Sequence, residues 1–199
     1  MNSHFWWYLS RSAGTVAWLL VLASCAWGIF LVTRLFRGYD GPAWLLDLHR
    51  WFGTLLLAAT VLHLIALVGD NYSHFGPKEL LIPFASSWHP RGVALGVLAM
   101  YMIAAIQITS WAMKKLPKKL WRAVHLSSYV AFIMVTWHAI TTGTDMTSRL
   151  YGALTIMMVT LAAALGAARL VTLRTPTKSP RLTQMPTPTT TKEEDIVSN

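Results

Sequence analysis

Five long stretches of this chain contain no Asp, Glu, Lys or Arg, and they restrict the folds that it can adopt. Each stretch has about the ~20 residues that an α-helix needs to cross the ~30 Å hydrocarbon core of a bilayer. Lipid offers the backbone no hydrogen bonds, so a spanning segment must satisfy its own as a helix. The sequence therefore predicts an all-α integral membrane bundle of five transmembrane helices. The charge-free stretches are 12–33, 51–69, 92–113, 123–144 and 150–168.

Composition agrees with a membrane protein and divides the chain into three parts. The chain is 54% hydrophobic and only 13% charged, whereas soluble domains carry about 25% charged residues. An aromatic segment, 1–11, is suited to the membrane interface. Residues 12–174 form the predicted transmembrane domain, with a short interfacial piece expected near 80–84. The Thr/Pro-rich tail, 175–199, is predicted to be disordered.

The positive charge is distributed by membrane side. Although the net charge is +9, 13 of the 17 basic residues fall in alternate connections and in the tail. Arg11, Lys78, Arg91 and Arg149 fall on the opposite side. The positive-inside rule then places the amino terminus outside and the carboxyl terminus in the cytoplasm of a cell, in a multi-pass arrangement typical of a bacterial plasma membrane. We therefore expect membrane lipid, and no nucleic acid, as the partner of this charge.

Two features that the sequence lacks restrict the cofactors that the chain can bind. Cys25 is the single cysteine, which excludes an internal disulfide, a Cys-rich metal site and covalent CxxCH haem attachment. No GxGxxG turn follows a predicted strand, and little chain follows residue 173. We therefore expect no flavin or nicotinamide site in this chain.

Four histidines stand in or at the ends of the predicted spans. His49 and His63 belong to the second span, and His125 and His138 to the fourth. One helix separates these spans, so they run in the same direction and form two pairs, His49 with His125 and His63 with His138. Their 14- and 13-residue separations correspond to about 20 Å along a helix axis. Neutral imidazole is a common haem ligand, so the pattern predicts two stacked bis-histidine b-type haems.

The angular positions of the histidines around their helices support the pair on the second span and do not support the pair on the fourth. Fourteen residues at ~100° each return His63 to within ~40° of His49. Thirteen residues leave His138 ~140° from His125 on a straight helix. A local bulge, a tilt or a different approach to the haem would have to compensate for this angle.

Four segments around these histidines resemble the ferric reductase-like transmembrane family. This family includes the haem-bearing membrane part of NADPH oxidases and the haem subunit of bacterial methionine sulfoxide reductase systems. The likeness covers roughly residues 5–173, although family members commonly have six helices, with ligands on the third and fifth. The segments are WLLDLHRW at 44–51, LIPFASS at 81–87, WRAVH at 121–125 and HAITTGTD at 138–145.

The resemblance implies an electron-transfer component of a reductase rather than a complete enzyme. Electrons would enter at the His49/His125 haem and leave from the His63/His138 haem. The donor would be a flavoprotein, a quinone or a larger complex, and the outer acceptor is open. Arg50 and Arg122 are candidate partners of the inner haem propionates. Arg91 and Arg149 are weaker candidates on the outer side.

Two other hypotheses remain open from the residues. Imidazoles inside a bilayer can also line a path for protons or divalent metal, although membrane acids that usually accompany such paths are absent from the charge-free stretches. Alternatively, the chain is an accessory subunit whose histidines only pack. Haem content distinguishes both hypotheses from the electron-transfer reading.

Overall fold

The computed structural model describes residues 4–33, 43–70, 75–143 and 148–174. These residues form helices and contain no strand, as the sequence predicts. The α-helices are α1 (Phe5–Thr33), α2 (Ala43–Gly69), α3 (Pro77–Leu81), α4 (Pro90–Trp111), α5 (Lys118–Leu126), α6 (Ser128–Thr142) and α7 (Arg149–Arg174).

The prediction of five spans is confirmed for the described residues. Helices α1, α2, α4 and α7 each provide one long apolar segment, while α5 and α6 together provide the fourth along the chain. The chain is therefore a multi-pass membrane protein. Residues 175–199 lie outside the described residues, so the predicted disorder of the tail stays a prediction.

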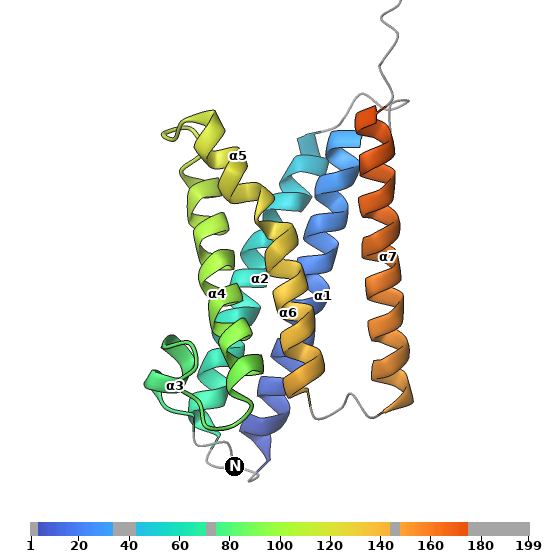
Figure 1. Cartoon of the computed structure of the whole chain (residues 1–199). Coiled ribbons are helices and arrows are strands. Elements are labelled where there is room, and N and C mark those ends of the chain that lie inside the picture. The colour runs from blue at the N-terminus through green and yellow to red at the C-terminus, as the bar shows by residue number, and fades with distance from the viewer. Residues whose placement is uncertain (1–3, 34–42, 71–74, 144–147, 175–199) are drawn as a thin grey trace, which may run out of the picture.

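The bundle consists of two antiparallel helix pairs and one outer helix. Helix α1 packs along α2, and α4 packs along α6, while α7 lies against α1 (Figure 1). Lys114, Lys115, Lys118 and Lys119 lie where α4 ends and α5 begins, at one end of the bundle, here called the basic end. The opposite end, called the α3 end, carries the start of α1 together with α3.

An apolar layer fills the middle of the bundle. Trp18 is only 2% exposed, and its indole Nε1–H donates to Thr136 Oγ1 at 3.1 Å. This bond satisfies both polar groups inside an otherwise hydrophobic interior. The layer draws on five helices and consists of Trp18, Val21, Leu22, Leu56, Ile103, Ala131, Phe132 and Met158.

Helix α1 begins earlier than the charge-free stretch suggests. It includes Trp6 and Trp7 and starts at Phe5 rather than near residue 12. The guanidinium of Arg11 lies 3.9 Å from the Trp7 ring centre, and such stacking helps a cation remain beside apolar surface. A Cβ added at Gly69 would lie 2.6 Å from the Trp6 ring. The start of α1 is thus packed against the end of α2.

Helix α3 is the short piece expected in the longest connection. It spans Pro77–Leu81, slightly earlier than 80–84, because Pro77 suits a first helical turn and Ile82 takes an extended backbone. The Tyr101 hydroxyl donates to the Leu81 carbonyl at 2.7 Å. This bond ties the connection to α4.

The fourth span is broken at Ser127, between the two histidines that it carries. The Ser127 amide bonds the Val124 carbonyl at 3.2 Å, and its hydroxyl donates to the same carbonyl at 2.6 Å. A backbone amide that bonds the carbonyl three residues earlier closes a tighter turn than the α-helical bond, which reaches four residues back. Of the alternatives that could compensate for the angle between His125 and His138, the structure has a local irregularity of the helix, which divides the span into α5 and α6.

Candidate functional site

His49 and His125 face one another near the basic end. Their ring centres are 5.9 Å apart, and the ring planes make an angle of 73°. Two imidazoles that share one metal ion, each with a nitrogen ~2 Å from it, have ring centres ~6 Å apart. The sequence-predicted pair is therefore brought together at a separation that suits a shared metal ion.

His63 on α2 and His138 on α6, the predicted second pair, both lie toward the α3 end (Figure 1). A backbone carbonyl holds each of these rings. His63 Nδ1 is 2.7 Å from the Ser10 carbonyl, and His138 Nδ1 is 2.8 Å from the Gly92 carbonyl. Because a carbonyl only accepts, each Nδ1 carries the proton and donates. Each Nε2 is then unprotonated and available as a ligand.

The paired histidines come from different parts of the bundle. The ligand-bearing α2 packs closely against α1 and only lightly against α4, while α6 packs chiefly against α4. His125 lies on α5 and His138 on α6, so each pair joins one histidine of α2 to one of the fourth span. The described His, Cys, Asp and Glu residues form no group of three or more. Each pair offers two protein ligands, which is the number that a bis-histidine haem needs.

Trp121 supports the His125 ring and carries an unused donor. Its indole stacks on the imidazole one turn later, with centres 5.1 Å apart and planes 24° apart. Its Nε1–H is buried and has no hydrogen-bond partner among the described residues. A buried unpaired donor costs roughly 1–3 kcal/mol. An acceptor on a group held between His49 and His125 would remove that cost, so the basic-end pair fits haem in this respect too.

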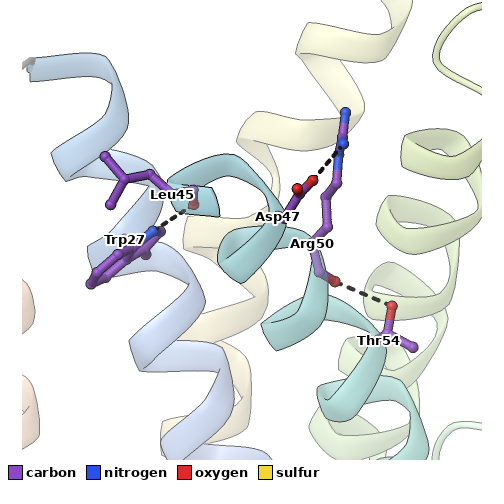
Figure 2. Close-up of polar contacts among 5 residues, drawn as sticks. All are labelled: Trp27, Leu45, Asp47, Arg50 and Thr54. Carbon is purple, nitrogen blue, oxygen red and sulfur yellow. Dashed lines mark hydrogen bonds and ion pairs between the residues drawn. The ribbon is translucent and has the colours of Figure 1, made fainter. Parts of the chain in front are cut away.

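Neither arginine proposed for the inner propionates reaches the histidines. Arg50 is exposed and forms an ion pair with Asp47 at 2.9 Å (Figure 2). Arg122 is exposed beside Trp121. Figure 2 also shows Trp27 donating to the Leu45 carbonyl, at 2.8 Å, which fixes the start of α2 against α1. The role of Arg50 and Arg122 toward a propionate therefore stays a prediction.

Two histidines outside the pairs have aromatic neighbours instead. His4 lies 6.4 Å from Tyr8 between ring centres, and His89 lies 4.6 Å from Trp88. Both are exposed. His74 lies outside the described residues.

The sequence analysis missed the residues that the paired histidines touch. Gly14, Gly28 and Gly96 each lie beside an imidazole, and Ser110 lies beside His125. A signal was present, because Gly14 and Gly28 are separated by the same 14 residues as His49 and His63, and so are Gly96 and Ser110. Small residues are common in membrane helices, so this spacing gains meaning only from the contacts.

Gly53, one turn after His49, has a different neighbour. A Cβ added there would clash with the side-chain oxygen of Gln107. Gln107 is buried on α4. Gly53 therefore leaves room for the Gln107 side chain where α2 meets α4.

Sequence comparison adds the family. The sequence model of the ferric reductase-like transmembrane component matches residues 13–136, a range that includes three of the four paired histidines and stops just before His138. The chain has no match among curated proteins or among solved structures. The match covers more than half of the chain, so this protein belongs to the ferric reductase-like transmembrane family.

Proposed function

We propose that this chain is a transmembrane b-type cytochrome that passes single electrons between a donor on one side of the membrane and an acceptor on the other. The observation that carries the proposal is the facing arrangement of His49 and His125, 5.9 Å apart between ring centres. His63 on α2 and His138 on α6 lie toward the other end of the bundle and would provide a second pair. Membership of the ferric reductase-like family supports the same reading.

The histidines would hold one haem b at each pair, and bound haem would supply reversible one-electron chemistry at its iron. With both histidines of a pair as its ligands, bound haem would supply one-electron transfer rather than direct binding of oxygen. Helices α2, α5 and α6 would provide the ligands, while the apolar layer between the pairs keeps water away from the path.

The sidedness of the proposal comes from the positive charge. The basic end carries Lys114, Lys115, Lys118 and Lys119, and the positive-inside rule makes it the cytoplasmic end of a cell membrane. The donor would then act at His49/His125 and the acceptor at His63/His138. A flavoprotein, a quinone or a larger complex would serve as donor.

A reduced-minus-oxidised absorption spectrum of the purified chain, with extracted haem counted per chain, tests the proposal. Two low-spin b-type haems per chain are expected. One haem would mean that only one pair is occupied. Haem-free protein, after expression with ample haem, would overturn the proposal and return the histidines to a transport or packing role.

A further inference from the structure

Helices α1 and α4 carry none of the four paired histidines, yet each imidazole lies against one of them at a small residue. A Cβ added at Gly96 would lie 2.7 Å from the His138 ring, and one at Gly14 would lie 3.1 Å from the His63 ring. At Gly28 the distance to His49 Cε1 would be 3.4 Å. At the fourth histidine, Ser110 Oγ is 3.5 Å from His125 Nδ1.

A backbone carbonyl one turn before Gly14 and before Gly96 completes the contact. His63 bonds the carbonyl of Ser10, four residues before Gly14. His138 bonds the carbonyl of Gly92, four residues before Gly96. His49 differs, because its Nδ1 is buried and has no hydrogen-bond partner among the described residues.

The four-residue spacing has a physical reason. In a helix, the carbonyl of residue i accepts the amide N–H of residue i+4, which leaves its second lone pair free for another donor. A side chain at i+4 projects back along the helix toward that carbonyl. Glycine at i+4 therefore opens the approach, and the imidazole ring occupies the space.

We infer that α1 and α4 are positioning helices, whose seats fix the rotation of the four imidazoles. A seat is defined here as a small residue that an imidazole packs against; the small residues are Gly14, Gly28, Gly96 and Ser110. At Gly14, Gly96 and Ser110 an acceptor for Nδ1 also fixes the tautomer. The inference rests on the proposed function. A ligand whose Nδ1–H is held by an acceptor keeps Nε2 for the metal and becomes more basic. The seats therefore determine where each imidazole lies and, where they include an acceptor for Nδ1, how strongly the imidazole donates electron density to the iron.

The seat of His125 differs from the others because its acceptor is a side chain. The Ser110 hydroxyl donates to the Ile106 carbonyl at 2.7 Å, which leaves its oxygen to accept from His125 Nδ1. Backbone carbonyls cannot be removed by substitution, but this hydroxyl can. Ser110→Ala keeps the Cβ and deletes only the acceptor.

The test compares glycine-to-alanine variants of the full chain, purified with haem. Haem per chain, the low-spin ferric electron paramagnetic resonance signals and a potentiometric titration are measured for each. Gly96→Ala and Gly14→Ala are expected to change or remove the His63/His138 haem alone, and Gly28→Ala the His49/His125 haem. The effect should fall from Gly96 to Gly14 to Gly28, in the order of the added contacts.

Gly152→Ala is the matched control. Gly152 lies on α7, and a Cβ added there meets nothing within 4 Å. Any general cost or benefit of alanine in a membrane helix appears in this variant. Its signals and potentials are expected to equal those of the unsubstituted chain.

Ser110→Ala is the milder test, independent of steric clash. Without the acceptor, the His125 imidazole donates less electron density to the haem iron. The reduction potential of the His49/His125 haem should therefore rise, while that of the other haem stays unchanged. This variant and Gly28→Ala decide the question if Gly96→Ala does not fold.

The outcomes separate the inference from the proposed function. An unsubstituted chain without haem would overturn both. Two haems in the unsubstituted chain, with unchanged signals and potentials in Gly14→Ala and Ser110→Ala, would overturn the seats alone. Loss of both haems together from Gly14→Ala would also contradict a local positioning role.

Discussion

An ionisable side chain inside a bilayer costs free energy, and this chain holds four histidines in its spans. Three of the rings have a polar or stacking contact that accounts for their orientation. His63 and His138 bond backbone carbonyls, and His125 stacks on Trp121. His49 faces His125, 5.9 Å away between ring centres, and its Nδ1 has no hydrogen-bond partner among the described residues. Ligands of a rigid site need contacts that hold each ring.

Substitution of single histidines should separate the two proposed haems. His49→Ala or His125→Ala removes one ligand of the basic-end pair, so haem content should fall by about one per chain and reduction from the cytoplasmic side should stop. His63→Ala or His138→Ala should leave the basic-end haem reducible and block outward transfer. Absorption spectra with a cytoplasmic-side reductant measure both effects.

His4→Ala is the control for these variants, because His4 is exposed and lies outside both pairs. It should keep both haems. Retention of both haems in His125→Ala or His138→Ala would disprove the ligand assignment.

At the residue scale, the sequence predicted that His49 and His125 lie together, as they do. It did not predict the small residues that the four imidazoles touch. An imidazole stands out in an apolar stretch because few functions justify its cost. Gly14 and Gly96 do not stand out, because glycine is common in membrane helices for packing alone. Trp121 belonged to a segment that resembles the family, yet its stack on His125 depends on side-chain rotation, which sequence spacing leaves open.

The break at Ser127 is the feature of a single element with the largest consequence. His125 and His138 are 13 residues apart, but Ser110 and Gly96, which they touch on α4, are 14 apart. A straight helix would not match these two spacings. The tight turn at Ser127 changes the direction and phase of α6 relative to α5, so both histidines reach the same neighbouring helix.

One alanine inserted after Leu126 should abolish haem binding at the His63/His138 pair only. The insertion turns α6 by about 100° and shifts it by about 1.5 Å relative to α5. His138 would then leave the Gly92 carbonyl, so the His63/His138 haem should be lost while the basic-end haem remains. Haem extraction and redox titration measure the outcome.

An alanine inserted within 144–147, between α6 and α7, is the matched control and should keep both haems. Equal loss of both haems in the two insertions would mean that the register of α6 has no special role.

At the element scale, the spans were predictable because an unpaired charge in lipid is costly, so gaps between charges mark the helices. The 13-residue spacing also indicated that the two histidines of the fourth span do not share a face of a straight helix, but it left a bulge, a tilt and a different approach to the haem open. Its location at Ser127 was not, since serine occurs elsewhere in the spans without a break. The start of α1 at Phe5 was missed because the stacking of Arg11 on Trp7 hides a cation inside the helix.

In the whole molecule, the basic residues are distributed unequally between the two ends of the bundle. Lys119 and its neighbours lie at the basic end, whereas Lys78 lies at the α3 end. The alternation of helix direction was predictable from the number of spans. The association of α1 with α2 and of α4 with α6 was not, because apolar faces in lipid give no amphipathic signal of which helix covers which.

Cysteine labelling should establish which end faces the cytoplasm. Lys78→Cys and Lys119→Cys each place a thiol at an exposed position. A membrane-impermeant maleimide applied to intact cells should label Lys78→Cys at once and Lys119→Cys only after permeabilisation. The unsubstituted chain, whose Cys25 lies within α1, is the control and should stay unlabelled. The reverse pattern would exchange the donor and acceptor sides.

Under the proposed function, the apolar layer between the histidine pairs would make electron transfer sensitive to the membrane voltage. Trp18, Leu56, Ile103 and Phe132 surround a low-dielectric interior, and the Trp18 and Thr136 polar groups bind each other. An electron that crosses this layer alone carries net charge through the membrane field, where each charge is worth about 2.3 kcal/mol per 100 mV. With the basic end in the cytoplasm, the negative resting voltage of a cell would drive that electron outward, so the rate of turnover would report membrane polarisation.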